Sequence, residues 1–188
     1  MPSTTQRPLT AFVSGHTDLS EANFESIYLP LLNAAIAQGH NFLIGDALGV
    51  DSFALQYLLS DVVKKQFPDV ATRRITVYPG RSHTIPALSA QGINVVSLND
   101  ARLQLTSEIA EVIGVVDGGK DHARYKFLIK DARMTLDSDY DILYVRGEEE
   151  SRAMYGKLYR ARVSATELNR RRREFLVTKR EAKEVHRG

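Results

Sequence analysis

Two glycines and two aspartates stand close together in the stretch LIGDALGVD, residues 43–51. The apolar residues 42–44 are typical of a buried strand, and the residues after Asp51 have the spacing of a helix. Glycine permits backbone angles and close approaches that other residues do not. The first turn of a helix attracts anions through its free N–H groups and its dipole. The stretch therefore predicts a loop that holds an anionic group such as a phosphate.

Each residue type in this loop has a specific expected part. Gly45 supplies an unusual backbone angle, and Gly49 lets the backbone or a ligand come near, so that Gly49→Val would abolish binding and leave the fold largely intact. Asp46 is expected to bond ribose hydroxyls or loop N–H groups, because a carboxylate and a phosphate repel one another. Asp51 is expected to be the N-cap of the following helix.

Two further loops have comparable residues. Ser14-Gly15-His16 ends an apolar run, and His16 there is either a general acid near neutral pH or a loop histidine that only bonds backbone. Thr166 with the N–H groups that follow it could grip a phosphate, or Ser164 or Thr166 could be a plain helix cap. Asn169 would project toward the same helix end.

The elements that must position these loops alternate along the chain. We expect strands at 9–14, 40–44, 74–78, 93–98 and 141–145, and helices at 20–39, 52–65, 100–113, 121–136 and from about residue 166. Pro30 is expected to kink or restart the first helix, and residues 148–150 to form an exposed loop. The fold class is therefore α/β: a single Rossmann-like domain over residues 1–188, with a mostly parallel sheet and helices on both faces.

Ligands of such sheets bind beyond the carboxyl ends of the strands, where the strand order reverses. We therefore expect residues 14–16, 45–51 and 164–169 to meet at one rim of the sheet. Residues 146–188 are rich in Lys and Arg, including the run at 170–173, which is either a solvated helix face or a surface for nucleic acid.

Composition narrows the classes of function. The chain has 188 residues, no cysteine, and a net charge of +2. Disulfides, thiolate metal sites and cysteine nucleophiles are excluded, and the spacing of the histidines predicts no metal site. No apolar stretch is long enough to span a bilayer and no signal-peptide core is visible, so a cytoplasmic protein without a membrane partner is expected.

Three blocks of the sequence resemble the SLOG superfamily, which includes the Smf/DprA proteins and the LOG phosphoribohydrolases. They are Ser14-Gly15-His16 with Gly45-Asp46-Ala47-x-Gly49-Val50-Asp51, then the stretch 130–142 (KDARMT and SDYDI), then residues 163–171 (VSATELNRR). The resemblance spans residues 10–173 and leaves a basic helical tail at 170–188. It implies a Rossmann-like nucleotide-binding domain in which Lys130 and Asp131 belong to the site.

The sequence departs from the family pattern at two loop positions and at the catalytic motif of the LOG enzymes. Asp46 replaces a glycine, Ala165 stands where glycine is usual, and the LOG pattern P-G-G-x-G-T-x-x-E is missing because Glu167 directly follows Thr166. LOG-type hydrolysis is thereby put in doubt, while binding is not.

The expected function is binding of a nucleotide or nucleotide-derived ligand, such as a nucleoside phosphate or an ADP-ribose-like molecule, with no cofactor. One alternative is an N-glycosidic hydrolase or transferase, with Asp46, Glu25 and Asp139 as catalytic candidates; a weaker one is single-stranded DNA binding. A homo-oligomer is considered, but the sequence leaves the assembly open. The residues expected to bind the ligand are Ser14, Gly15, His16, Gly45, Asp46, Ala47, Gly49, Val50, Asp51, Lys130, Asp131, Ser164, Ala165, Thr166 and Asn169.

Overall fold

A five-stranded, all-parallel sheet forms the centre of the molecule in the computed structural model, which describes residues 7–80, 84–96, 100–117, 125–161 and 163–185. The strands are β1 (Thr10–Ser14), β2 (Asn41–Ile44), β3 (Ile75–Val77), β4 (Asn94–Val95) and β5 (Tyr140–Leu143). Their order across the sheet is β4-β3-β2-β1-β5. The chain adds strands in one direction from β1 to β4 and then returns to the other side of β1, so the strand order reverses between β1 and β5. The α/β fold class is confirmed.

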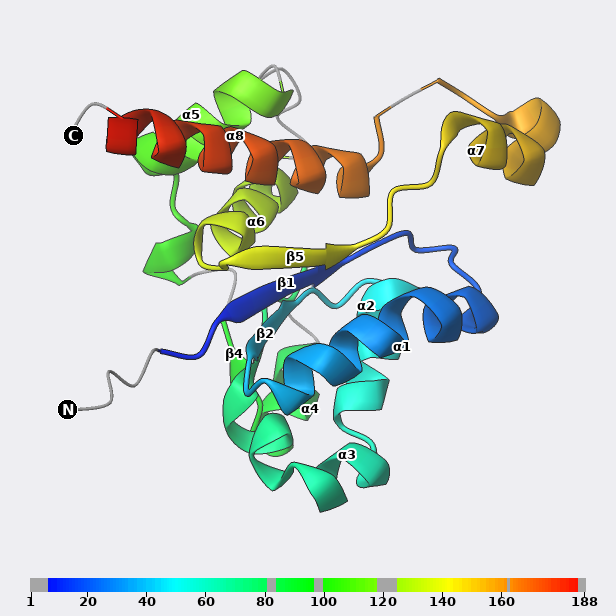
Figure 1. The fold of residues 1–188 in the computed structure, drawn as a ribbon, viewed down its shortest axis with the longest axis vertical. Helices are drawn as coiled ribbons and strands as arrows, with labels where there is room; N and C mark the ends of the chain where they lie inside the picture. Colours follow the sequence, from blue (N-terminus) through cyan, green and yellow to red (C-terminus); the bar gives the residue numbers. More distant parts are fainter. Residues whose placement is uncertain (1–6, 81–83, 97–99, 118–124, 162, 186–188) are drawn as a thin grey trace.

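Eight α-helices connect and cover these strands in the described residues. They are α1 (Glu21–Ala37), α2 (Val50–Leu58), α3 (Asp61–Gln66), α4 (Ile85–Ala90), α5 (Ser107–Asp117), α6 (Tyr125–Leu136), α7 (Glu148–Tyr155) and α8 (Ala165–Val185). Short helical turns occur at η1 (Val70–Arg74), η3 (Ala101–Leu103) and η5 (Gly156–Leu158). Figure 1 shows α1 and α2 on one face of the sheet and α5, α6 and α8 on the other.

The alternation of strand residues divides the core between these two faces. Ala11 and Val13 of β1 belong to the cluster beneath α1 and α2, whereas Phe12 packs with Met134 of α6 on the opposite face. A further apolar cluster, which includes Ile109 and Ile129, joins α5, α6 and α8. Because both faces are covered, the strands are apolar on both sides, as parallel strands require.

Several element boundaries differ from those expected. The predicted helix 52–65 is two helices, because Ser60 accepts the N–H of Val63 and caps α3. The first helix runs through Pro30 from its Ser20 cap without restarting. Glu148–Glu150 begin α7 rather than a loop, and α4 was not predicted. The predicted strand at 93–98 and helix at 121–136 fall partly on residues outside the described ranges.

None of the helices in the described residues is both long enough and apolar enough to cross a bilayer.

Candidate functional site

Gly49 brings two loops of the site into direct contact. Its φ is +71°, and a Cβ built there would lie 2.4 Å from the carbonyl oxygen of His16 and 2.7 Å from that of Thr17. The next amide, that of Val50, donates to the His16 carbonyl oxygen at 3.4 Å. The glycine therefore makes room for the β1–α1 loop and not for a ligand. The expectation that Gly49→Val spares the fold is wrong, since valine would be strained by both the φ angle and the backbone.

Gly45 leaves space for two charged side chains. A Cβ at this position would lie 2.2 Å from Oδ2 of Asp51 and 3.4 Å from Nζ of Lys130. The Asp51 carboxyl and the Lys130 ammonium group therefore both lie beside Gly45 at the carboxyl end of β2, and Lys130 pairs with Asp131 at 3.5 Å. Glycine at 45 is required by these neighbours.

Asp51 does not cap α2. Gly49 is the N-cap residue, and no side chain caps this helix end. Asp51 lies in the first turn, and its Oδ2 accepts the N–H of Ala47 at 3.2 Å. The N-cap prediction was wrong because the helix begins before Asp51, at Val50.

The environment of Asp51 favours its neutral form. Burial raises the pKa of this carboxyl to about 7, while Lys130 and the N–H of Ala47 oppose the shift. Burial is the largest cause, because it removes water from the charged form. Asp51 therefore exchanges a proton near neutral pH, at the wall of the site.

Asp46 ties its loop to the segment after β3. One carboxylate oxygen accepts the N–H of Gly80 at 2.6 Å, and the other accepts the hydroxyl of Thr84 at 3.0 Å. The sequence left two kinds of partner for Asp46, ribose hydroxyls and loop N–H groups, and the structure shows donors from a loop. The carboxylate keeps acceptor capacity beyond these two bonds.

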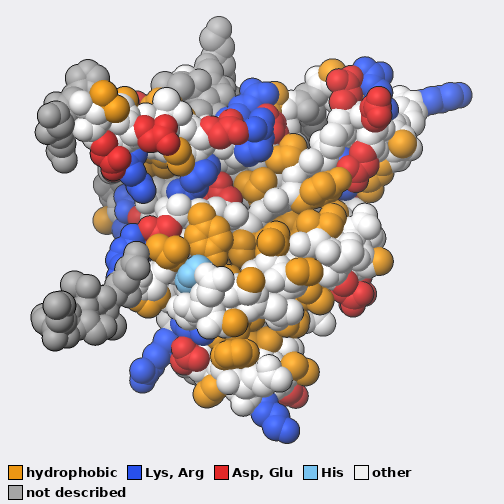
Figure 2. Space-filling view, viewed as in Figure 1, with side chains coloured by type: hydrophobic (Ala, Val, Ile, Leu, Met, Phe, Trp, Pro, Cys, Tyr) orange, Lys and Arg blue, Asp and Glu red, His pale blue; other side chains and the backbone are white. Residues whose placement is uncertain are grey.

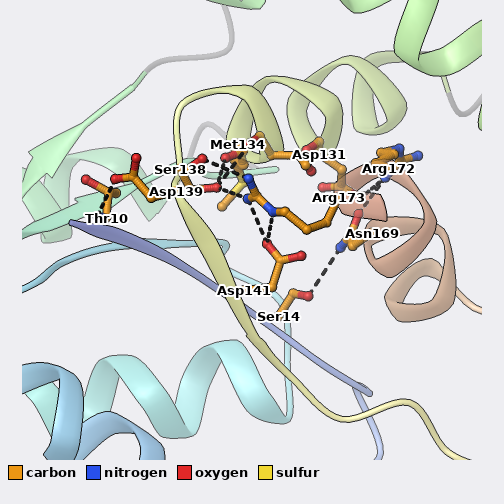
Figure 3. Close-up of polar contacts among 11 residues, drawn as sticks. Thr10, Ser14, Asp131, Met134, Ser138, Asp139, Asp141, Asn169, Arg172 and Arg173 are labelled. Carbon is orange, nitrogen blue, oxygen red and sulfur yellow. Dashed lines mark hydrogen bonds and ion pairs between the residues drawn. The ribbon is translucent and has the colours of Figure 1, made fainter. Parts of the chain in front are cut away.

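The start of α8 joins the carboxyl end of β1 through buried polar side chains. Nδ2 of Asn169 donates to Oγ of Ser14 at 3.3 Å, and Oδ1 of Asn169 accepts from Arg172 (Figure 3). Arg172 is fully buried, and its guanidinium lies 3.9 Å from the carboxylate of Asp131 on α6. The first and third predicted loops are thus brought together, as expected.

Ser164 is the cap of α8. Its hydroxyl accepts the N–H of Glu167 at 3.1 Å, and its carbonyl oxygen accepts that of Leu168. Ala165 is exposed, and Thr166 is buried at the first turn. Of the two alternatives for this loop, the plain cap is therefore present, formed by Ser164.

His16 bonds backbone. Its Nε2 lies 3.1 Å from the N–H of Arg146 and accepts from it, so the proton of the neutral ring is on Nδ1. Burial, followed by the nearby Arg146 charge, lowers the pKa of His16. A neutral acceptor is what this position needs, and the loop-histidine alternative describes it better than the general acid.

Arg146 and Asp18 are site-edge residues that the sequence did not reveal. The Arg146 guanidinium is buried and pairs with Asp18 at 3.0 Å, and Asp18 also accepts from Tyr155 of α7. These contacts fasten the segment after β5 to the β1–α1 loop. The partners lie 128 residues apart, so no local spacing signals them.

A pocket of ≈ 330 Å³ opens beside the Gly45–Asp51 loop. Polar groups on its wall come from Asp46, Asp51, Ser52, Gln56 and Thr84, and apolar ones from Leu55, Leu59 and Leu88. An apolar wall with a few polar groups is the usual lining of a small-molecule site.

Two of the catalytic candidates lie outside this site. Asp139 lies at the amino end of β5, where it pairs with Arg7 and accepts the N–H of Thr10 at 2.8 Å (Figure 3). It cannot share a site with Asp46, because Asp139 lies at the amino ends of the parallel strands and Asp46 lies at their carboxyl ends. Glu25 is exposed on α1.

The arginine run is engaged within its own chain. Arg170 and Arg171 pair with Glu167, and Arg173 pairs with Asp141 at 2.9 Å and donates to Ser138 (Figure 3). Arg170 and Arg171 are exposed, as the solvated-face alternative predicts, whereas Arg172 is buried and Arg173 partly buried, so the run as a whole is not a solvated face. Among the described side chains, no group of three or more acidic residues and histidines is placed to hold a metal ion.

No protein-family model, curated protein or solved structure matches this chain. What defines the protein is therefore its Rossmann-like α/β fold and the set of loops gathered at the carboxyl ends of β1 and β2.

Proposed function

We propose that the protein binds a nucleotide-derived ligand, a nucleoside phosphate or an ADP-ribose-like molecule, at the Gly45–Asp51 loop. The observation that carries the proposal is that the start of α2, which has no side-chain cap, lies beside a pocket. No side chain caps the start of α2, where the Val50 amide donates to the His16 carbonyl oxygen. Lys130, which pairs with Asp131, lies beside Gly45, and the ≈ 330 Å³ pocket is lined by Gly45 and by Asp51 and Ser52 of the first turn.

The parts of such a ligand match the parts of the site. A phosphate is favoured by the helix start and by the Lys130 ammonium group. A nucleoside fits the apolar wall of Leu55, Leu59 and Leu88, with Gln56 available for polar edges of a base. The resemblance to the SLOG superfamily supports the same ligand class, and a cytoplasmic location goes with it.

A melting-temperature screen with nucleoside mono- and diphosphates, ADP-ribose, NAD and cyclic nucleotides tests the proposal. A ligand present at 100 times its Kd should stabilise the fold by about 2.7 kcal/mol. Lys130→Gln should weaken binding by about tenfold or more, equivalent to roughly 1.4 kcal/mol. Lys126→Gln, which changes an exposed lysine one turn earlier on α6, is the matched control and should bind as the wild type does. No shift with any compound, or equal shifts in the two variants, would contradict the proposal.

A second candidate is cleavage of an N-glycosidic bond, and Asp51 is the observation that favours it. A carboxyl with a pKa of about 7 on a pocket wall can donate a proton to a leaving base near neutral pH. The test is release of free base from AMP, NAD or deoxynucleoside monophosphates by wild type, compared with Asp51→Asn. Turnover that is lost in the variant while ligand binding persists would support the enzyme; absence of turnover in the wild type would leave binding alone.

A further inference from the structure

Strand β5 ends the sheet with an open edge. In the described residues it pairs with β1 alone. In a complete doubly wound sheet, more strands follow beyond the point where the order reverses. Natural edge strands are usually protected by lysine, proline or a bulge. The residues of β5, Tyr-Asp-Ile-Leu, include no lysine or proline, and Arg173 neutralises their one charge, Asp141.

The backbone of β5 directs hydrogen-bonding groups toward this edge. The N–H of Asp139 donates to the Thr10 carbonyl oxygen of β1 at 2.8 Å. Since successive residues of a strand direct these groups to opposite edges, those of Asp141 also face β1, and those of Tyr140 and Ile142 face the open edge. These are the groups with which a further strand would pair.

The surface around this edge is apolar. A groove of ≈ 390 Å³ lies between β5 and α1. Most of its lining is apolar, including Leu9, Leu31 and Ile142, and its polar residues are Gln38, His40 and Asp141. Leu9 and Leu31 are 37% and 46% exposed. Figure 2 shows hydrophobic side chains gathered across the middle of the face on which β5 and α1 lie in Figure 1. Contiguous apolar surface of this kind is typical of an interface.

The side chains of β5 and of Tyr144, the residue that follows it, are arranged symmetrically about Ile142 on one face. Tyr140, Ile142 and Tyr144 point to the α1 face, with a tyrosine on each side of the isoleucine. A two-fold axis through Ile142 would place Tyr140 opposite the partner's Tyr144 and Asp141 opposite the partner's Leu143, so like charges are not opposed. Cross-strand aromatic pairs stabilise such a ladder by roughly 0.2–1 kcal/mol each.

Both tyrosines are already held in place by their own chain. The Tyr140 hydroxyl lies 2.7 Å from Nδ1 of His40, and the Tyr144 hydroxyl donates to Glu150. The N–H of Tyr144 is taken by the Tyr28 hydroxyl, so the ladder uses the N–H groups of Tyr140 and Ile142. A surface that repeats itself about a two-fold axis is complementary to its own copy.

We propose that the chain forms a homodimer in which β5 pairs antiparallel with β5 of a second copy, centred on Ile142. One sheet then runs through both copies, and the groove beside α1 is covered. The assembly does not depend on the ligand proposed above.

Sedimentation of the wild type over a dilution series tests the assembly. At the upper end we expect twice the chain mass of 21.0 kDa. Leu31→Glu places a charge in the apolar groove and should weaken the dimer by about tenfold or more. Val62→Glu changes a 63% exposed apolar side chain on α3, away from the groove, and should leave the dimer intact. Ala34→Glu, one turn along the same face of α1, is a second variant in case Leu31→Glu does not fold.

Hydrogen exchange identifies the interface. In the dimer the amides of Tyr140 and Ile142 should exchange slowly, and in Leu31→Glu they should become fast, while the amide of Asp141 stays protected by β1. A wild type that is monomeric throughout the dilution series overturns the proposal. So does a dimer whose Ile142 amide is unprotected, because that dimer would use another surface.

Discussion

The helices α2 and α8 both begin at the carboxyl ends of the strands, yet their first turns are built in opposite ways. At α2, side chains are left out: Gly45 and Gly49 admit neighbouring groups, and no side chain caps the helix. At α8, polar side chains are added: Ser164 caps the helix, and Asn169 bonds Ser14. At the carboxyl ends of the strands, the start of α2 is therefore held by close backbone packing, and the start of α8 by hydrogen bonds between polar side chains.

This difference indicates which helix start is available to an anion. The Glu167 amide of α8 already donates to Ser164, whereas the first turn of α2 has no side-chain acceptor at its cap. A phosphate would therefore compete with Ser164 at α8 but not with a cap at α2. If the proposed function holds, the anionic end of the ligand is expected at α2 rather than at α8.

The largest expected effect is on the stability of the glycine loop. Gly49→Val should lower the free energy of unfolding by about 4 kcal/mol or more, because strain at a positive φ adds to a clash with the backbone. Gly39→Val is the matched control, since Gly39 has a similar φ of +78° but nothing within 4 Å of an added Cβ. Urea unfolding measures both variants. Equal losses would show that the contact with His16 contributes nothing beyond the φ strain.

Periodicity and glycine position were enough to predict the alternation of elements and the gathering of the three loops. The central strands β1 and β2 are mostly apolar because both faces of the sheet are covered, and such runs are visible in the sequence. The cap of α1 at Ser20 was predictable for the same reason, since capping depends on neighbours a few residues away.

The parts that could not be predicted depend on partners distant in sequence. The neighbours of Gly49 are Thr17 and the carbonyl of His16, and the partner of Arg146 is Asp18. Helix α7 was missed because none of its residues is buried, so no apolar period marks it. Its placement depends on Tyr155 reaching Asp18, which only the folded chain shows.

A smaller effect is expected from the buried charge at α2. The folded protein keeps the Asp51 proton up to a pKa of about 7, while the unfolded chain releases it near the ordinary aspartate pKa of 3.8. Between these values the folded state binds more protons than the unfolded state. Raising the pH across this range therefore lowers the free energy of unfolding of the wild type. Asp51→Asn has no such proton, so the difference in the free energy of unfolding between the two proteins should change by about 3–4 kcal/mol across that range.

Denaturant unfolding of both proteins at a series of pH values measures this difference. Above about pH 7, where Asp51 is ionised in both states, the two profiles should run parallel and provide the internal control. Profiles that are parallel over the whole range would mean that the Asp51 carboxyl is ordinary and that the two helix starts differ only in their packing.

The smallest expected effect concerns the cap of α8. Ser164→Ala removes the acceptor for the Glu167 amide and should cost about 1 kcal/mol of stability, the usual loss for an N-cap. If the anion binds at α2, the melting shift caused by a nucleotide should be the same size in Ser164→Ala as in the wild type, although both proteins start from different melting temperatures. If the anion binds at α8 instead, removal of the competing hydroxyl frees an N–H group, and the shift should grow. A larger shift in Ser164→Ala would therefore reverse the assignment of the two helix starts while leaving nucleotide binding itself in place.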